Sequence, residues 1–397
     1  MKIHSIHIKL FILISILFAY VQSTAAQSGD WSNYKASGYE SGSGTEADPY
    51  VIKTAEQLAY FAAQVTAGND LTANVELRSS IDLGAHYWVP IGDRGASAVR
   101  PANEFAGVFN GNGCTISNMT VDFSSGVNNG LFSQLKEGCI VRNINFENAK
   151  LFCTSLTGVT HRMGVVAGAT YGTSAVPSIE NISIRNSSIK AEKNVVQPHH
   201  FLVGGIMGGL FHQTNIKNCY MDVDIDLSLV SYSSTSKAYI AQAVAGVDGG
   251  TGNPSLTLKN VYSVGKQTLI SQMNYPNVGT MVGWNPNKVL LTECYYKNVP
   301  TDKNGNALSL VDASHKNGEQ KTEDYSDGFV TLANGNLGDN LQSWKISSSK
   351  PKVIAKYISV KQSHEGHTSK TIKVSIDNDD DNDTYTYEWT YERDKTY

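Results

Sequence analysis

The middle of the chain repeats a short pattern of apolar and polar positions. The pattern is apolar-x-Asn-apolar-x-apolar, and the asparagines of its five clear copies are separated by 25, 38, 37 and 42 residues. A second landmark, a short apolar core such as Gly205-Ile206-Met207-Gly208, alternates with the first in a fixed order. Two landmarks that keep their order over several copies predict a repeat architecture. The five asparagines, to which we assign a structural role, are Asn118, Asn143, Asn181, Asn218 and Asn260.

The phase of the alternation predicts the geometry of each repeat. Apolar residues such as Ile116 share the parity of Asn118 before it, and they shift by one position after it, as at Met119 and Val121. Because a one-residue slip moves side chains to the other face of a strand, the apolar set stays inside only if the chain turns a corner at the Asn. Asn tolerates the left-handed backbone that such a corner needs, and stacked Asn side chains can bond along the stack.

We therefore predict an all-β fold, a right-handed parallel β-helix (β-solenoid) of about six coils. An antiparallel β-sandwich would explain short strands but not two landmarks that recur together. Because the ends of a solenoid need covering, we expect a small N-terminal cap with a helix that starts at Thr54 and ends at Gly68. We expect an irregular C-terminal cap built on Phe329, Leu332, Leu337, Leu341 and Trp344.

The predicted organisation has five parts. Residues 1–26 form a leader, 27–100 an N-terminal segment and cap, 101–300 the β-helix repeats, 301–356 the C-terminal cap and 357–397 a tail.

The leader predicts export. Lys2 and Lys9 precede a short apolar run at 10–19, and small residues at 23–26 suit cleavage. This run is shorter than the ~20 residues that a membrane-spanning helix needs. We therefore expect a signal peptide, no transmembrane segment, and a chain that is secreted or held at the cell surface or outer membrane. An N-terminal anchor that stays uncleaved is the alternative.

Composition and net charge limit the classes of partner that we expect. The chain has 397 residues and a formal net charge of −4, which argues against a nucleic-acid partner. Charged residues make up only 17%, beside 35 glycines and 20 tyrosines, a mixture typical of a turn-rich β protein. We expect a monomer. The five cysteines show no CxxC spacing, which argues against a zinc site: Cys114, Cys139, Cys153, Cys219 and Cys294. Four of the five fall inside the apolar pattern of the repeat, so we expect buried small hydrophobic residues and leave the disulfide status open.

Several segments resemble bacterial surface proteins with GLUG repeats. The entry segment from Gly44 to Leu58, the Trp88-Val89-Pro90-Ile91-Gly92 run and the small-apolar-apolar-Gly cores carry this resemblance over about residues 40–350. It implies a β-helical fold and a place among adhesin-like exported proteins of gut Bacteroidota, where such modules also occur beside immunoglobulin-A-cleaving metalloproteases. The cores depart from the usual Gly-Leu-x-Gly, as at 243–246.

The tail leaves the repeat composition. Alternating segments at 372–376 and 385–389, with Trp389 on the second, look like strands B and C of an immunoglobulin-like domain. The tail is too short for that fold, so we expect an incomplete module from a fragment or a truncated reading frame. The acidic run at 377–383 has the composition of a calcium loop without its spacing, so we favour a solvated turn and expect no cofactor.

One acidic row could carry chemistry. Asp222, Asp224 and Asp226 alternate along a predicted strand and would lie about 7 Å apart on one face, which suits acid/base work on a glycosidic bond or calcium binding. A solvated outer face explains the same alternation, and we favour it. Four histidines, His161, His199, His200 and His212, could gather a metal across coils, but ordinary loop histidines are favoured.

Inserts between the landmarks offer a binding surface. We expect the segments near 150–163, 187–202, 227–241 and 265–277 to project as loops, with Tyr232, Tyr239 and Tyr275 as candidate contacts for glycan or protein. The predicted function is a non-enzymatic, adhesin-like binding or display module whose partner is a host or plant glycan or a surface protein. The alternatives are a carbohydrate-active lyase or glycosidase that uses the acidic row, and a passive spacer for a missing C-terminal domain.

Overall fold

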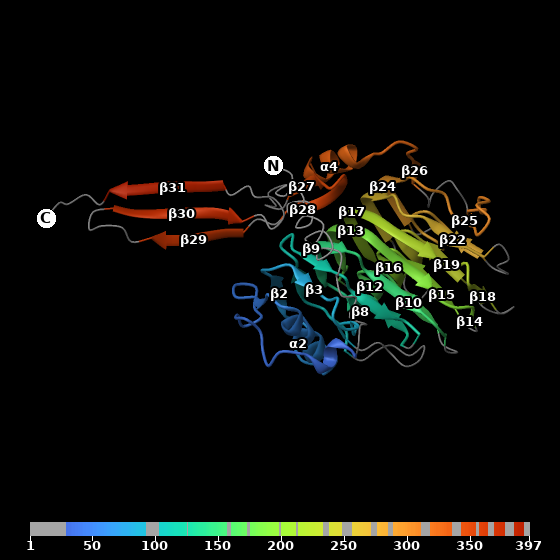
Figure 1. The fold of residues 1–397 in the computed structure, drawn as a ribbon, viewed down its shortest axis with the longest axis horizontal. Coiled ribbons are helices and arrows are strands. Elements are labelled where there is room, and N and C mark those ends of the chain that lie inside the picture. Colours follow the sequence, from blue (N-terminus) through green and yellow to red (C-terminus); the bar gives the residue numbers. More distant parts are fainter. Residues whose placement is uncertain are drawn as a thin grey trace, which may run out of the picture.

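A computed structural model shows an all-β chain that winds into about five turns of a β-solenoid (Figure 1), as predicted and close to the expected number of coils. The structure describes residues 29–92, 103–124, 126–156, 160–172, 175–197, 200–211, 213–232, 238–247, 256–270, 276–284, 289–310, 318–335, 343–354, 357–363, 369–377 and 385–392.

Each turn adds strands to one parallel main sheet that runs along the molecule. The longest path joins β1 (Tyr50–Ile52), β2 (Asn74–Leu77), β4 (Val108–Asn110), β9 (Ile140–Glu147), β13 (Ser178–Ala191), β17 (Thr214–Asp226), β21 (Leu256–Ser263), β24 (Val289–Tyr296) and β26 (Glu319–Gln320). The other members are β3 (Ile81–Asp82), β5 (Thr115–Ser117), β6 (Thr120–Asp122), β10 (Lys150–Cys153), β22 (Gln267–Leu269) and β25 (Thr301–Asp302). Because β1 and β2 already belong to this sheet, it begins inside the segment that we assigned to the N-terminal cap.

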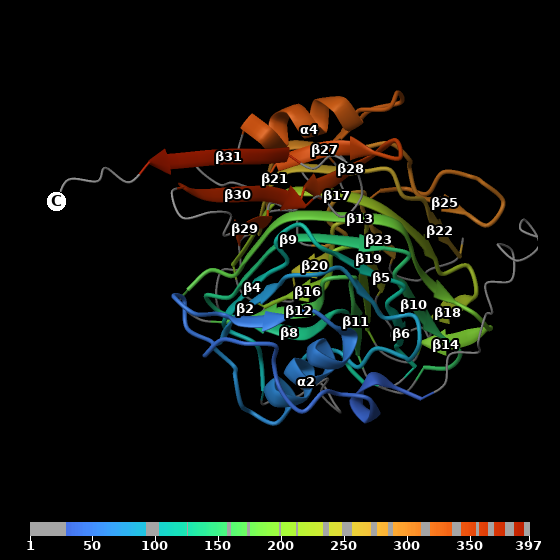
Figure 2. The same cartoon turned by 60° about the vertical axis from the view of Figure 1, so that its left-hand side comes forward.

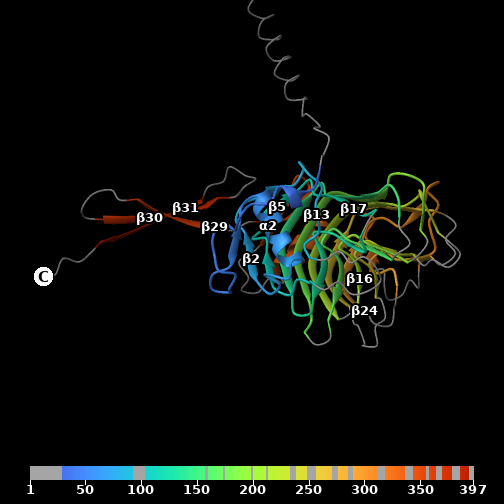
Figure 3. The ribbon, with the colours of Figure 1, turned by 90° about the horizontal axis from the view of Figure 1, so that it is seen from below.

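Two more parallel sheets close each turn (Figures 2 and 3). One contains β7 (Asn128–Asn129), β11 (His161–Met163), β15 (Phe201–Gly204), β19 (Ala238–Ala241) and β23 (Pro276–Val278). The other contains β8 (Phe132–Lys136), β12 (Ala167–Tyr171), β16 (Met207–Leu210) and β20 (Val244–Val247), and a separate pair joins β14 (Val195–Gln197) to β18 (Val230–Tyr232). The apolar cores lie where the chain passes between these sheets. A Cβ at Gly208 would lie 2.4 Å from the backbone nitrogen of Met163, so the glycine allows the close approach.

The predicted corners are present. All five repeat asparagines have a positive φ of 50° to 59°. Four of them form a hydrogen-bonded column in which each Nδ2 donates to the Oδ1 of the coil before it. The donor–acceptor pairs are Asn143–Asn110 at 2.9 Å, Asn181–Asn143 at 3.0 Å, Asn218–Asn181 at 3.0 Å and Asn260–Asn218 at 3.1 Å.

Asn118 belongs to a different corner, so its assignment to the same column is wrong. Its Nδ2 donates to Asp82 at 2.9 Å, and its Oδ1 accepts from Asn148 at 3.4 Å. The apparent 25-residue step therefore joined two different corners. The strand register gives 32 residues between neighbouring coils there, from Val108 to Ile140.

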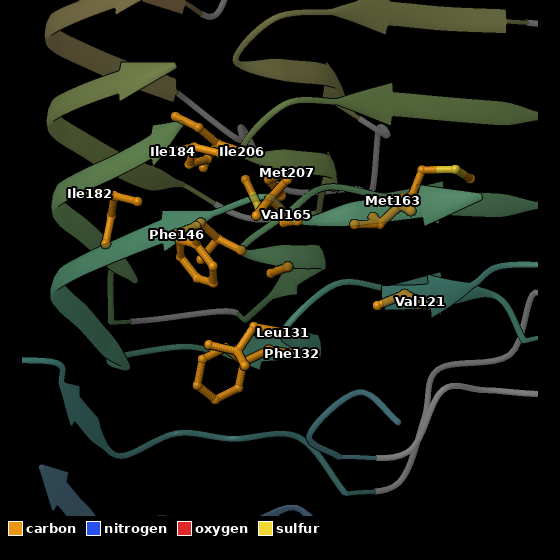
Figure 4. Close-up of a cluster of buried hydrophobic side chains, with 14 of the residues drawn as sticks. Val121, Leu131, Phe132, Phe146, Met163, Val165, Ile182, Ile184, Ile206 and Met207 are labelled. Atoms are coloured by element: carbon orange, nitrogen blue, oxygen red, sulfur yellow. The ribbon is translucent and has the colours of Figure 1, made fainter. Parts of the chain in front are cut away.

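The interior is a continuous apolar core. Phe146, Ile182 and Ile184 from the main sheet face Val165 and residues of the opposite strands across the solenoid (Figure 4). All five cysteines are buried, as predicted, and none of them forms a disulfide.

The expected N-terminal helix is α2 (Ala55–Thr66), which follows a short 3-10 turn, η1 (Trp31–Asn33). Its N-cap, Thr54, accepts a hydrogen bond from the backbone of Gln57 at 3.3 Å, and Gly68 follows its end with a φ of +86°. The apolar face of α2 is buried against the first coils. Within the described part of the chain, no helix is long and apolar enough to cross a membrane.

The segment predicted to cover the last coil lies instead along the side of the solenoid. It contains α4 (Ser326–Gly335) and a hairpin of β27 (Ser343–Ser347) and β28 (Lys350–Ile354), which lie over the outer face of β9, β13, β17 and β21 (Figure 2). Phe329 and Trp344 bury Tyr220 and Tyr262, whose rings project from that face. Leu332 is half-buried on α4, and Leu337 and Leu341 lie outside the described residues. An outward column of aromatic side chains explains the placement, because it needs an apolar cover.

The tail forms an antiparallel sheet of β29 (Tyr357–Ser363), β30 (Ser369–Asp377) and β31 (Tyr385–Glu392). β30 and β31 pair directly, whereas strands B and C of an immunoglobulin domain belong to opposite sheets. The assignment of these two segments to strands B and C is therefore wrong, and an immunoglobulin-like module as such stays a prediction.

Candidate functional site: a polar cleft beside the main sheet

The acidic row lies on the outer face of β17. Asp222 is half-buried, Asp224 and Asp226 are exposed, and the residues between them face the core. Each carboxylate accepts a backbone N–H: Asp222 from Asn186 at 3.0 Å, Asp224 from Lys266 at 2.9 Å and Asp226 from Ser228 at 3.1 Å. The row therefore caps backbone groups of its own and neighbouring coils.

Beside Asp222 lies an open cleft of about 400 Å³ between the main sheet and the β27–β28 hairpin. This volume falls within the ~300–1,000 Å³ of small-molecule sites. β9 and β13 supply one wall and the hairpin the other. The lining residues are all polar: Glu147, Arg185, Asn186, Ser347, Ser348 and Lys350.

Side chains of the main sheet fix the hairpin in place by hydrogen bonds to the backbone of β28. The side-chain amide of Asn145 on β9 makes two hydrogen bonds to the backbone of Val353, in the way that a neighbouring strand would. Its Nδ2 donates to the Val353 carbonyl and its Oδ1 accepts from the Val353 N–H, both at 2.9 Å. Ser183 on β13 donates to the carbonyl of Pro351 at 2.6 Å. These buried contacts hold the second wall of the cleft at a fixed distance from the first.

Two ion pairs lie at the cleft, one along the sheet wall and one between the hairpin and the sheet. Arg185 Nη2 lies 2.8 Å from Glu147 Oε2, and Lys350 Nζ contacts Asp222 Oδ2. Lys350 also donates to the side-chain oxygen of Asn186, whose amide donates to Glu147. The four ionised groups carry no net charge together, and each is less than one-third exposed.

Hydrogen bonding in this network is incomplete. The Arg185 side chain is only 9% exposed, yet its Nε–H finds no acceptor among the described residues. Glu147 Oε2 likewise accepts no well-directed hydrogen bond from the described part of the chain, although Arg185 is close. Lys350 has three N–H bonds and uses two of them on Asp222 and Asn186. Because Arg185 Nε and Glu147 Oε2 are themselves shielded from solvent, the hydrogen-bonding capacity left at the cleft surface by this network is the third N–H of Lys350.

A strained turn forms the rim of the cleft. Ser347 pairs with Lys350, so Ser348 and Ser349 are the two residues of the turn, and both have a positive φ, 50° and 64°. Two-residue turns of this kind favour Asn-Gly because both positions need φ above zero. Serine at both positions strains the backbone, and strain of this kind is concentrated at functional sites.

The tyrosines predicted as loop contacts have different fates. Tyr239 is not in a projecting loop: it belongs to β19, is only 6% exposed and packs on Trp284 with ring centroids 5.0 Å apart. The described parts of the insert near 227–241 contain the strands β18 and β19, because a full coil needs more residues than the misassigned 25-residue step suggested. Tyr232 ends β18, where the structure describes its backbone, and Tyr275 lies outside the described residues.

Metal ligands do not gather in the described part of the chain, where no group of three or more His, Cys, Asp or Glu side chains could hold an ion. His161 is buried and His200 half-buried, while His199, His212 and most of the acidic run at 377–383 lie outside the described residues.

Sequence reasoning missed the cleft. Lys350 lies 128 residues from Asp222 and Ser183 lies 168 residues from Pro351, so no local pattern links them. The one signal in the sequence was Ser-Ser-Ser between two short alternating segments, at 347–349, which could have indicated a tight hairpin.

No family model matches the sequence. Over 148 residues the chain is 30% identical to a "Putative Gly-rich membrane protein" of Evansella cellulosilytica, which covers 37% of this chain and 15% of that protein. Over 137 residues it is 32% identical to "Halomucin" of Haloquadratum walsbyi, which covers 33% of this chain and 1% of that protein. The chain thus spans a small part of the curated relatives that it matches.

A crystal structure described as a "putative immunoglobulin A1 protease" from Bacteroides ovatus is similar to 79% of this chain and 94% of its own chain. The TM-score is 0.46 and the sequence identity is 18%.

Proposed function

We propose that this chain is exported and works as a non-enzymatic, adhesin-like binding module at the cell surface, with the polar cleft as its ligand site. The observation that carries the proposal is the cleft itself: about 400 Å³, lined only by polar side chains, with a buried Arg185 donor that no described residue accepts. A parallel solenoid supplies a rigid frame for such a site. The name of one partial relative, a putative Gly-rich membrane protein, supports a place at the cell envelope.

The carboxylates support binding over catalysis. Glycosidic hydrolysis needs one carboxyl group that gives up a proton and a second that attacks or activates water. Here Asp222, Asp224 and Asp226 each accept a backbone N–H, and Asp222 and Glu147 also face a cation. These contacts engage each carboxylate with backbone or cationic groups of the fold itself, which favours a structural role.

An array of host and plant glycans, mucins and matrix proteins tests the proposal. The chain from Gln27 onward should be retained on one class of ligand, and Lys350→Ala should weaken this retention by about tenfold or more, because it removes a charged donor from the cleft. Asp224→Asn is the matched control on the same face, and it should leave retention unchanged.

Other outcomes contradict the proposal. Release of reducing ends from a polysaccharide that is lost in Asp224→Asn would establish the enzyme alternative. A blank array for the whole chain would favour the passive spacer.

A further inference from the structure

We infer that the cleft takes an uncharged saccharide and contacts it through the hydroxyl group of Ser348 in the strained serine turn. The inference rests on the proposed binding function and names the ligand class of the same site. Its first support is the charge balance of the cleft, where two cations face two carboxylates.

A charged ligand would have to break this balance. An anion would compete with Asp222 for Lys350, or with Glu147 for Arg185, and would leave a carboxylate of limited exposure without its cation. A cationic ligand would compete with Lys350 for Asp222, or with Arg185 for Glu147, and would leave a basic side chain without its carboxylate. Arg185 cannot move out to meet a ligand without uncovering a side chain that is 9% exposed. A neutral ligand leaves both ion pairs in place.

The side chains that line the cleft restrict the chemical class of the ligand further. The cleft offers ammonium and amide donors, the carboxylate of Glu147 and the hydroxyl groups of Ser347 and Ser348, with no aromatic or aliphatic side chain among its lining residues. An apolar ligand would gain little there, because burial of its surface against polar groups costs their hydration. A ligand hydroxyl both donates and accepts, so it can join this network without leaving a partner unpaired. Many such groups on an uncharged, compact molecule describe a saccharide.

The turn adds an independent observation. Ser348 is exposed on the rim and lines the cleft, and its backbone strain is shared by Ser349. Glycine at both positions would relieve the strain and remove the hydroxyl groups. If the serines serve only to connect two strands, replacing them with glycine would increase stability without weakening ligand binding.

The test compares two stabilising changes. Ser348→Gly with Ser349→Gly should raise Tm and weaken binding by about tenfold or more. The control is Glu293→Asn, at a position with a φ of 55° that does not line the cleft. It should also raise Tm, because asparagine tolerates this backbone better, and it should leave binding unchanged. The probes are cellohexaose, xylohexaose and mannohexaose as neutral ligands, and hexagalacturonate as an acidic one, titrated calorimetrically against the chain from Gln27 onward.

The outcomes separate the inference from the proposed function. Binding of a neutral hexasaccharide that weakens only in the serine variant supports the inference. Stronger binding of hexagalacturonate overturns the ligand class and keeps a binding module. Unchanged binding in the serine variant overturns the role of the turn. Failure of all four probes, together with array retention on a protein ligand, overturns the saccharide inference and leaves the binding function standing.

Discussion

The asparagine column ends at a position where one substitution should lengthen it. In the last coil Glu293 occupies the corner opposite Asn260, because Lys259 pairs with Thr292 and Val261 with Cys294. Glu293 has a φ of 55°, which a bulky side chain tolerates poorly. A carboxylate has no N–H to donate, and Asn260 Oδ1 accepts no hydrogen bond from any described residue. Glu293→Asn would supply the missing amide in a residue suited to this backbone.

The expected gain has two parts. Relief of left-handed strain is worth up to ~1–2 kcal/mol, of which Asn recovers a portion. The new Asn–Asn hydrogen bond adds ~0.5–1.5 kcal/mol. A total of about 1–2 kcal/mol should raise Tm by ~2–6 °C for a domain of this size, measured by differential scanning calorimetry.

Two control variants separate the contributions. Glu293→Gly relieves the backbone strain without supplying an amide, and Glu293→Ala removes the carboxylate without doing either. Asn should exceed both. If Glu293→Ala stabilises the chain as much as Glu293→Asn, removal of the carboxylate is the cause and the reasoning about the column is refuted.

Three further predictions concern stability. Asn181→Ala should lower the free energy of unfolding by ~2–4 kcal/mol, because it breaks two column hydrogen bonds and replaces a residue suited to positive φ; urea titration measures this. Asn145→Ala should cost about 2–4 kcal/mol by leaving the backbone of the hairpin unpaired, and hydrogen exchange at 350–354 should rise with it. Burial raises the pKa of Cys153 from 9.0 and of Tyr295 from 10.0, each to about 12. Because both groups stay protonated to higher pH in the folded chain than in the unfolded chain, they contribute to the free energy of unfolding in full below pH ~9. This contribution is lost between pH ~9 and 12, which thermal melts across this range would show as a falling Tm.

The corners illustrate how much of the fold the sequence predicts. A one-residue phase shift at Asn143 or Asn218 is a local signal, and the structure confirms a positive φ at each. Assigning Asn118 to the same column failed because two corners of one coil use the same residue type with the same local phase. Only the register between strands distinguishes them.

The candidate site illustrates what local patterns miss. Its parts come from β9, β13, β17 and a hairpin far along the chain, and its ion pairs join residues that share no spacing rule. The acidic row was visible because three carboxylates alternate on one strand, whereas the cation that faces Asp222 is Lys350, in the hairpin. Tyr239 was misplaced for a related reason, because a strand of one sheet and a long insert look alike where side chains of both faces are buried.

The most direct test of the account is hydrogen–deuterium exchange of the chain from Gln27 onward, with and without the neutral saccharide that binds it. Ligand in the polar cleft should slow exchange at the turn, residues 347–350, and at Arg185 and Asn186 on the opposite wall. Protection confined to the inserts near 227–241 or 265–277, with the turn unaffected, would contradict the account and move the binding surface to the segments that the sequence first suggested.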